Sequence, residues 1–335
     1  MNKRFDKVLT VSVAAYNIEK YIREALDSFT GIKDENAVEV LIIDDGSTDN
    51  TASIAEDYCK RYPHVFRLIK KENGGWGSTV NTGIREAKGK YFRLLDGDDY
   101  LNKEILGEYL EFLSRSESDV IISPYKMIRS SGKAVRDFNY NCSVDGGVLD
   151  DVPDDWNLEV HSSTFRTEIL QKGNVNITEN CFYTDMEYMA RSVLLCKTWS
   201  MFKKAIYLYR IGEEGQSVSV SGFLKHREEH IKIVFLMLNF YNDLRSERKK
   251  RLISRNIEIM IRSQYDIFWL LGTDRNGKEL IRSFDNELHT KCRELYNSCA
   301  SKKILLARFL RFHVFSVFSV IVKRKYGFNK GMVRR

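Results

Sequence analysis

Three aspartates crowd into four positions of the stretch RLLDGDDYL (residues 93–101): Asp96, Asp98 and Asp99. Two carboxylates about 5 Å apart repel each other by about 3 kcal/mol at an effective dielectric constant of about 20. A divalent cation removes this cost, because Mg²⁺ and Mn²⁺ prefer oxygen ligands and often bind one or two carboxylates together with substrate phosphates. An EF-hand is excluded, since the acid and the glycine that its loop requires are missing at the matching positions. The stretch therefore predicts a metal site; the alternative is a solvated turn that caps the next helix.

A second acidic pair, Asp44 and Asp45, lies in the stretch VEVLIIDDGSTDNT (residues 38–51). Like the first cluster, it directly follows an apolar run that is typical of a strand buried on both faces. Two clusters at the ends of two buried strands favour a shared binding site. The alternative for this pair is an ordinary turn and helix cap.

The apolar runs belong to a regular alternation of strands and helices. We expect strands at residues 8–15, 38–44, 65–70, 91–95 and 118–128, with helices between them and a polar, Asp-rich insertion at about 130–160. This spacing predicts an α/β fold made of βαβ units around a mostly parallel sheet. Ligands of such sheets bind beyond the carboxyl ends of the strands, where both acidic clusters fall.

Four stretches match, in order, the motifs of family 2 glycosyltransferases, and through them the chain resembles this family. They are VSVAAYN (11–17), VEVLIIDDGSTDNT (38–51), NGGWGSTVNTGIREAKGKYFRLLDGDD (73–99) and FYTDMEY (182–188). The resemblance implies the GT-A nucleotide-diphospho-sugar transferase fold, followed by a C-terminal helical region. It also implies inverting transfer of a sugar from a UDP-sugar. DGDD would be the family's DxD motif, whose acids hold Mn²⁺ or Mg²⁺ against the donor's diphosphate.

The resemblance implies a pocket for the nucleotide base at the ends of the first two strands. Tyr16 and the backbone of Ala14 and Ala15 would border the base. Asp45 would accept a hydrogen bond from a uracil ring nitrogen, and Asp44 would support the turn. The family commonly has a proline before its Tyr-Asn pair and this chain has an alanine, so the fine shape of the pocket is not carried over.

At the phosphate end of the donor, the resemblance implies that Asp96 lies near the ribose and the metal. Asp98 and Asp99 would be further metal ligands, with Gly97 between the acids in contact with the donor. The choice of the direct ligand among the three aspartates stays open.

The glycine-rich stretch ENGGWGSTVNTG is not a dinucleotide fingerprint, because it lacks the GxGxxG spacing and follows the third strand. Its glycines, Gly75 among them, are expected to let the backbone approach the donor closely. Ser78 and Asn81 would then hydrogen-bond to the sugar or a phosphate. The alternative is a helix start that only packs.

A single displacement needs a base that takes the proton from the attacking hydroxyl group. The resemblance assigns this role to Asp185 in YTDMEY, where Thr184 replaces the family's usual Glu. Glu187 is the weaker candidate, because a helical turn would aim its side chain elsewhere. The alternative for Asp185 is a helix N-cap.

Four further residues are candidates for the donor and acceptor side of the site. Arg210 would pair with a phosphate, since its planar guanidinium suits bidentate contacts. His161, Gln216 and Ser217 are candidates for contacts with the acceptor, the last two from a loop that would close over the donor. The alternatives are a surface arginine and a packed, uncharged histidine.

The charged residues divide the chain into an acidic N-terminal part and a basic C-terminal part. From Gly222 to the C-terminus there are 25 Lys and Arg against 11 Asp and Glu, whereas the preceding residues have 28 against 35. We expect three parts: a catalytic domain at residues 1–221, a helical accessory region at 222–300 and a basic amphipathic tail at 301–335.

The tail contains ten Lys and Arg residues and no Asp or Glu, interleaved with leucine, phenylalanine and valine. Arg308 and Arg311 fall on one side of a helix. This pattern predicts an interfacial segment on an anionic membrane. The apolar density disfavours nucleic acid as the partner. The alternative is a helix that packs on the catalytic domain.

The N-terminal residues lack the pattern of a signal peptide, and no apolar run reaches the roughly 18 residues of a membrane span. The six cysteines show no metal-binding spacing. We therefore expect a cytoplasmic protein, peripheral on the inner face of the cell membrane.

The expected function is transfer of single sugars to a glycan or lipid-linked acceptor in the synthesis of a surface glycan. The QxxRW motif of processive family members is absent. Two alternatives remain: a sugar nucleotidyltransferase, and a catalytically inactive glycan-binding or scaffold protein.

Overall fold

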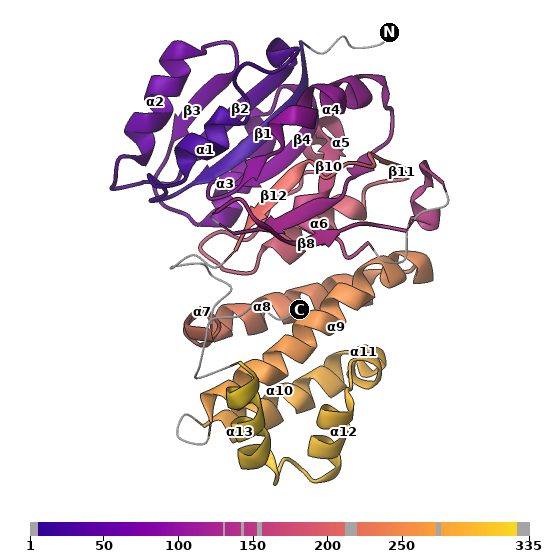
Figure 1. The fold of residues 1–335 in the computed structure, drawn as a ribbon. Helices are drawn as coiled ribbons and strands as arrows, with labels where there is room; N and C mark the ends of the chain where they lie inside the picture. Colours follow the sequence, from indigo (N-terminus) through magenta and orange to yellow (C-terminus); the bar gives the residue numbers. More distant parts are fainter. Residues whose placement is uncertain are drawn as a thin grey trace. The chain divides into compact units, whose positions relative to one another are not determined.

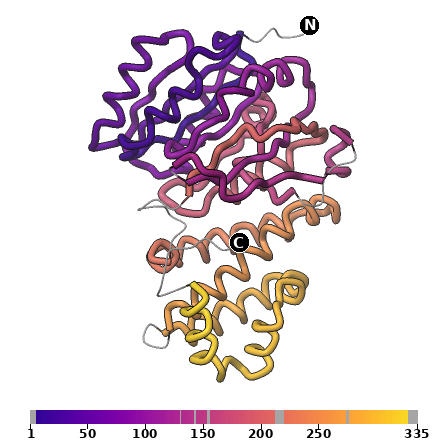
Figure 2. The backbone as a smooth tube through the Cα atoms, viewed as in Figure 1, coloured from indigo at the N-terminus to yellow at the C-terminus, as the bar shows by residue number. Residues whose placement is uncertain are grey.

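The computed structural model describes residues 6–129, 131–141, 144–152, 156–211, 220–272 and 276–326. The chain divides into two compact units, residues 1–211 and residues 212–335. The first contains both β-sheets, and the described part of the second is helical (Figures 1 and 2).

An eight-stranded sheet with the order β3-β2-β1-β4-β10-β6-β11-β9 forms the centre of the first unit (Figure 1). Strands β1 to β4 are parallel, whereas β10 is antiparallel to both of its neighbours. The strands are β1 (Lys7–Ala15), β2 (Val38–Asp44), β3 (Phe66–Lys70), β4 (Gly89–Asp96), β6 (Val120–Ile122), β9 (Gly146–Val148), β10 (Ser163–Arg166) and β11 (Thr198–Met201).

A smaller sheet with the order β5-β12-β7-β8 completes the strands of this unit. Its strands are β5 (Tyr100–Leu101), β7 (Tyr125–Ile128), β8 (Ala134–Phe138) and β12 (Tyr207–Arg210). The helices are α1 (Ile22–Asp27), α2 (Thr51–Arg61), α3 (Trp76–Glu86), α4 (Lys103–Arg115), α5 (Thr167–Lys172) and α6 (Asp185–Val193), with 3₁₀ turns η1 (Glu35–Ala37), η2 (Leu149–Asp151) and η3 (Val160–Ser162).

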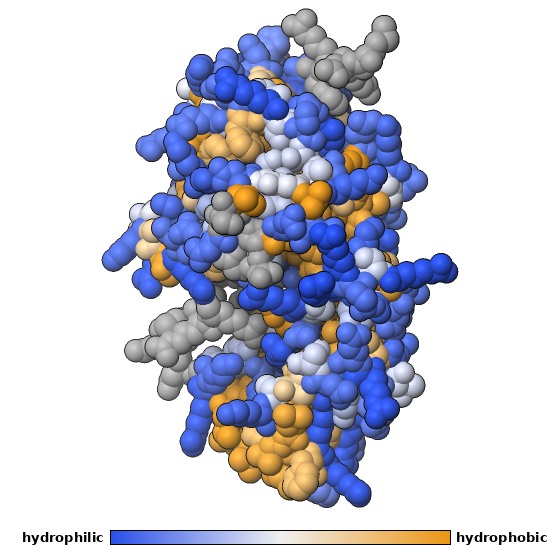
Figure 3. Space-filling model, turned by 90° about the vertical axis from the view of Figure 1, so that its right-hand side faces the viewer, coloured by the Kyte–Doolittle hydropathy of each residue, from blue (hydrophilic) through white to orange (hydrophobic). Residues whose placement is uncertain are grey.

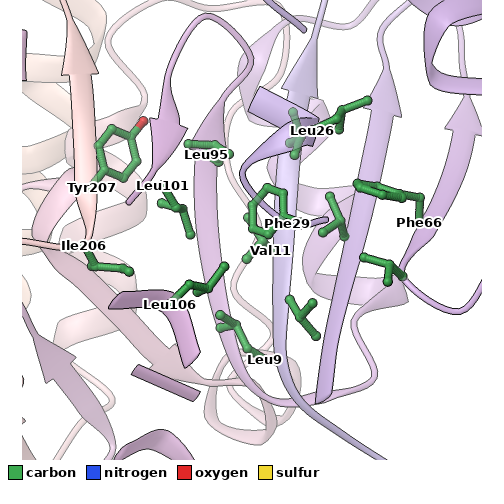
Figure 4. Close-up of a cluster of buried hydrophobic side chains, with 14 of the residues drawn as sticks. Leu9, Val11, Leu26, Phe29, Phe66, Leu95, Leu101, Leu106, Ile206 and Tyr207 are labelled. Carbon is green, nitrogen blue, oxygen red and sulfur yellow. The ribbon is translucent and has the colours of Figure 1, made fainter. Parts of the chain in front are cut away.

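The main core of the unit lies between the parallel strands and helices α1, α2 and α4. Leu9 and Val11 of β1 meet Leu26 of α1 and Leu106 of α4 in this cluster, and Phe29 lies beside them (Figure 4). Helix α3 packs against β1 and β2. A Cβ on Gly83 of α3 would lie 2.2 Å from the hydroxyl oxygen of Ser12 in β1, so glycine at this position allows the close approach of helix and sheet.

The predicted α/β fold with a large central sheet is confirmed, but the prediction of one strand at residues 118–128 was wrong. The run divides at Ser123 and Pro124 into β6 and β7, which belong to different sheets. Proline has no backbone N–H and cannot continue a central strand ladder. The Asp-rich insertion contributes β8 to the smaller sheet and β9 to the edge of the larger one. Because β10 is antiparallel to β4 and β6, only the half of the large sheet from β3 to β4 is purely parallel.

The second unit is a group of helices around the 25-residue α9. Helices α8, α10 and α13 all pack against α9. The helices are α7 (Val220–Lys225), α8 (Arg227–Asp243), α9 (Glu247–Leu271), α10 (Gly277–Lys291), α11 (Arg293–Ser298), α12 (Lys302–Phe309) and α13 (Phe315–Lys325).

Helices α12 and α13, which form the described part of the basic tail, use one face each to join this group. The Arg308 Nε donates to Asp285 Oδ1 at 2.7 Å, and Ser319 Oγ donates to the carbonyl of Trp269 at 2.7 Å. Lys303 pairs with Asp266. Among the residues that the structure describes, no helix is long and apolar enough to cross a membrane.

Candidate active site at the carboxyl ends of the parallel strands

The sheet brings the two acidic clusters of the sequence to the same edge. In the register of the strands, Ala15 of β1 lies opposite Asp44 of β2, and Ala14 lies opposite Asp96 of β4. The backbone N–H of Gly97 donates to the carbonyl of Ala14 at 3.1 Å. Both clusters therefore flank the end of β1, as parallel strands require.

Asp96 lies at the centre of the candidate site. Its Oδ1 accepts a hydrogen bond from Trp76 Nε1 at 2.9 Å, and its Oδ2 lies 4.0 Å from His161 Nε2. Its backbone N–H donates to the Tyr207 hydroxyl oxygen at 3.2 Å. Burial, and then the negative charge of Asp98, raise the pKa of Asp96 to about 7. An opposite charge at this point would be favourable.

Asp99 is buried and turned toward the second sheet. Its Oδ2 accepts from the Tyr207 hydroxyl at 2.7 Å, and its Oδ1 accepts from the backbone N–H of Arg210 at 2.7 Å. Burial, followed by the charges of the two neighbouring aspartates, raises the pKa of this carboxyl group well above its usual value. Asp98 is half-buried, and its carbonyl accepts from Arg210 Nε at 2.8 Å.

His161 is held beside Asp96 by aromatic rings and by a buried arginine. Its ring stacks on Tyr209 at 4.3 Å between centroids. The fully buried Arg93 donates to the carbonyl of His161 and, at 2.7 Å, to Thr164 Oγ1. Burial, and then the charge of Arg93, lower the pKa of His161 to about 3, so the ring is neutral.

The ligand atoms of Asp96, Asp99 and His161 lie within 4.8 Å of one another, and this is the one group of potential metal ligands found among the described residues. Carboxylate oxygens and a neutral imidazole suit Mn²⁺, and the carboxylates alone suit Mg²⁺. Asp98 stands between the two aspartates in the chain. The residues present therefore fit a divalent metal.

Asp45 organises the glycine-rich loop that precedes α3. Its Oδ1 accepts from Lys71 Nζ at 2.6 Å and from the backbone N–H of Gly74 at 3.0 Å, while Oδ2 accepts from the N–H of Gly75 at 2.8 Å. Lys71 Nζ also donates to Ser78 Oγ at 2.8 Å. The carboxylate of Asp45, which was expected to accept a hydrogen bond from the nucleotide base of the donor, is thus hydrogen-bonded to groups of the protein itself. Asp44 Oδ1 accepts from the N–H of Ser47 at 3.2 Å, which supports the turn.

Gly74 of this loop and Gly77 in the first turn of α3 lie close to another part of the chain, residues 177–180. A Cβ on Gly77 would lie 2.2 Å from the carbonyl oxygen of Thr178, and the carbonyl of Gly74 accepts from the N–H of Asn180 at 2.7 Å. The amide of Asn81 bonds to both backbone groups of Ile177, at 2.7 and 2.9 Å. Here the close approach joins two protein segments.

Asp185 is the first residue of α6 and its side chain is exposed, as a base that meets an acceptor must be. Desolvation by the surrounding protein raises the pKa of Asp185. Its charge also contributes to the raised pKa values of Asp96 and Tyr209, which places it on the same side as the DGDD acids.

The other acid of α6, Glu187, is fully buried and serves the protein itself. Its Oε2 accepts from the N–H of Thr178 at 2.9 Å and its Oε1 from Arg191 Nε at 2.8 Å. Glu187 therefore holds the 177–180 segment in place, and Asp185 remains the better candidate for the base.

Arg210 and Tyr16 occupy contrasting positions. Arg210 is buried, and its Nη2 donates to Glu24 Oε2 at 2.6 Å. Tyr16, at the end of β1, is 50% exposed and open to a stacking partner. Gln216 and Ser217 lie outside the residues that the structure describes.

Three residues of the site were missed by the sequence reasoning: Trp76, Tyr207 and Arg93. Trp76 stands within a matched motif, but nothing in the pattern indicates that its indole reaches Asp96. Tyr207 is 111 residues away from Asp96 in the chain. A charged residue inside the apolar run YFRLL is a signal that was available for Arg93, since a buried guanidinium needs partners.

Residues 10–181 match the model of the family described as glycosyl transferase family 2, and the chain belongs to this family. It is similar to the minor teichoic acid biosynthesis protein GgaB of Bacillus subtilis, with 25% identity over 298 residues, 88% of this chain and 32% of the relative. It is also similar to the poly(ribitol-phosphate) beta-N-acetylglucosaminyltransferase TarS of Staphylococcus aureus, with 27% identity over 212 residues, 63% of this chain and 36% of the relative. The chain thus spans about a third of the length of these curated relatives.

Two solved structures support the fold assignment. One is the structure of S. aureus TarS 1–349 in complex with UDP. The match spans 95% of this chain and 90% of the TarS chain, with a TM-score of 0.65 and 22% sequence identity. The other is the mannosyltransferase PcManGT from Pyrobaculum calidifontis in complex with GDP-Man and Mn²⁺. The match spans 96% of this chain and 88% of the PcManGT chain, with a TM-score of 0.54 and 13% sequence identity. At these identities the likeness shows the fold, a glycosyltransferase α/β fold with a helical C-terminal region.

Proposed function

We propose that this chain transfers a sugar from a UDP-sugar to a glycan or lipid-linked acceptor by a single displacement with inversion. The main observation behind the proposal is that the DGDD acids lie beside the carboxyl end of β1, where Asp96 is opposite Ala14. Nucleotide ligands bind at this edge of open α/β sheets. Membership of glycosyl transferase family 2 supports the reaction class.

A divalent metal, Mn²⁺ or Mg²⁺, is proposed to be held by Asp98 and Asp96, with Asp99 beside them. When bound, it supplies Lewis-acid stabilisation of the charge that develops on the departing nucleoside diphosphate. Trp76 donates a hydrogen bond to Asp96 and so orients its carboxylate, and His161 lies beside it. Asp185 is proposed to take the proton from the attacking hydroxyl group.

The acceptor is proposed to be a surface glycan or its lipid-linked precursor, with one sugar added per encounter. The relatives' names point to teichoic acid synthesis and to poly(ribitol-phosphate) as an acceptor of one of them, which supports this class of polymer. Such acceptors are assembled at a membrane, so we place the enzyme in the cytoplasm at the inner face of the cell membrane. His161, whose Nε2 lies 4.0 Å from Asp96 Oδ2, is proposed to contact the acceptor.

A sugar nucleotidyltransferase would need a glycine-rich loop with Arg and Lys directly after the first strand. This chain has AAYNIEKY there. The loop is held instead by Asn17 Oδ1, which accepts from the N–H of Thr48 at 2.8 Å. The alternative of an inactive scaffold is disfavoured by the complete set of acids at the strand ends.

The test is turnover of nucleotide sugars by the purified chain with Mn²⁺, with UDP-N-acetylglucosamine, UDP-glucose and GDP-mannose compared. We expect release of UDP from at least one UDP-sugar, and loss of that release when EDTA removes the metal. Formation of pyrophosphate from a nucleoside triphosphate and a sugar phosphate would identify a nucleotidyltransferase instead. Binding without any turnover, in the presence of acceptor polymer, would identify a scaffold.

A further inference from the structure

Helices α12 and α13 expose large apolar side chains although their other faces are already packed. Six of the thirteen large hydrophobic side chains that are exposed among the described residues lie within a span of only 17 residues. Phe309 is 83% exposed, more than any other. We call this set the α12–α13 apolar face; it consists of Leu305, Leu306, Phe309, Val317, Val320 and Ile321.

The spacing of these residues separates them from the helical core. On α12, Leu305, Leu306 and Phe309 follow helical spacing, while Ile304 and Ala307 are buried on the opposite side. On α13, residues 317, 320 and 321 share a face, and residues 315, 319 and 322 are buried. Each helix thus has two apolar sides, of which only one is used by the core.

The exposed sides gather in one region of the helical unit. In the space-filling view, hydrophobic side chains lie together at the end of the unit where α12 and α13 are drawn in Figure 1 (Figure 3). Soluble monomers rarely expose apolar patches of this kind unless something binds there.

The charged residues of α12 and α13 themselves are all positive. Lys302 stands one turn before Leu305 and Leu306, and Arg324 one turn after Val320 and Ile321, on the same helix sides. Both are exposed, and residues 301–335 contain no acidic residue. Of the other cations of these helices, Lys303 and Arg308 pair with acids of the helical core, and Lys325 Nζ lies 3.6 Å from Asp266 Oδ2.

We propose that the α12–α13 apolar face docks on an anionic lipid surface, with the apolar side chains among the acyl chains and the flanking cations at the headgroups. An apolar face with basic ends is the pattern of interfacial helices, and each Lys or Arg near an anionic bilayer adds to the attraction. The sequence pattern placed Arg308 and Arg311 on one side of a helix, but α12 ends at Phe309, before Arg311. Arg308 is bonded to Asp285, so the proposed membrane contact belongs to Leu305, Phe309 and Ile321 instead.

The choice of a membrane rests on the proposed function only through the location of the acceptor. Lipid binding is measured without any sugar transfer, so failure of either proposal can be recognised without the other. The residues of the face belong to the second unit, and the candidate active site belongs to the first.

The experiment is co-sedimentation of the full chain with vesicles of phosphatidylglycerol or of phosphatidylcholine. We expect binding to the anionic vesicles that weakens with salt, and much weaker binding to the zwitterionic ones. The variant Leu305→Ser/Phe309→Ser/Val320→Ser/Ile321→Ser should bind at least about tenfold more weakly, because it removes most of the inserted apolar surface. Circular dichroism and UDP-sugar hydrolysis by this variant should match those of the unchanged chain.

A matched control replaces Val135, Val144 and Val148, exposed apolar residues of the first unit, by serine and should bind as the unchanged chain does. The substitutions Lys302→Gln and Arg324→Gln should reduce binding to anionic vesicles only. Equal binding of the four-serine variant would overturn the proposal. So would retention on polyphosphate without vesicle binding, or a dimer that the four-serine variant dissociates and that binds no vesicles.

Discussion

Replacing Asp185 by asparagine is expected to lower kcat for sugar transfer by about 10²- to 10⁴-fold, the usual contribution of a general base. The amide keeps the size of the carboxylate but cannot take the proton from the acceptor hydroxyl. Affinity for UDP should stay within about twofold, since the side chain is exposed at the start of α6 and is proposed to meet the acceptor. Initial rates with saturating donor and calorimetric titration with UDP measure the two quantities.

The control for this prediction is Glu187→Gln, the other acid of the same helix. Glu187 accepts hydrogen bonds from the Thr178 N–H and from Arg191 Nε. Replacing its carboxylate should therefore lower the free energy of unfolding by about 1–3 kcal/mol. Its effect on kcat should be far smaller than that of Asp185→Asn once the protein is folded. A folded Glu187→Gln variant without activity, beside an active Asp185→Asn variant, would exchange the two assignments.

The second large effect is expected for Asp98→Asn, which should lower kcat/KM by about 10²-fold or more. Lewis-acid stabilisation by a metal supplies several kcal/mol, and each 1.36 kcal/mol is about a factor of ten in rate. The substitution removes one negative charge from the proposed ligand set without changing its shape. Activity measured across a Mn²⁺ titration should show a higher metal requirement.

A comparison with Asp99→Asn separates metal binding from folding. Asp99 accepts hydrogen bonds from Tyr207 and from the Arg210 backbone, so this change should lower the melting temperature more than Asp98→Asn does. If Asp98→Asn kept the metal dependence of the unchanged enzyme, Asp98 would not be a ligand.

The parts of the site that local sequence could predict are those set by strand order. Parallel strands that end in acids must present them at one edge, and the register of Ala14 with Asp96 and of Ala15 with Asp44 follows from that rule. The fold class follows from the alternation of apolar runs and amphipathic helices.

The parts that could not be predicted depend on contacts between distant segments. Tyr207 and His161 reach Asp96 from strands and turns that the sequence pattern does not pair. The close packing of Gly77 on Thr178 is equally invisible before folding, because a glycine that meets a ligand and one that meets another loop look alike in sequence.

The tail illustrates the same limit from the other direction. Its basic and apolar composition predicted an interfacial segment, but the pattern cannot tell which cations remain free. Arg308 turned out to bond to Asp285 and Tyr265 within the helical unit. Only the packed structure separates the buried side of each helix from the exposed one.

The most direct test of the central claim is the thermal stability of the chain with UDP alone, Mn²⁺ alone and both together. A ligand present at about 100 times its Kd stabilises the native state by about 2.7 kcal/mol. The aspartates at the end of β4, Asp96, Asp98 and Asp99, are proposed to hold a metal against a diphosphate. The melting temperature should therefore rise most with both ligands, and this joint rise should vanish in Asp98→Asn. A rise with UDP that is unchanged by EDTA, or no rise with any nucleoside diphosphate, would contradict the account.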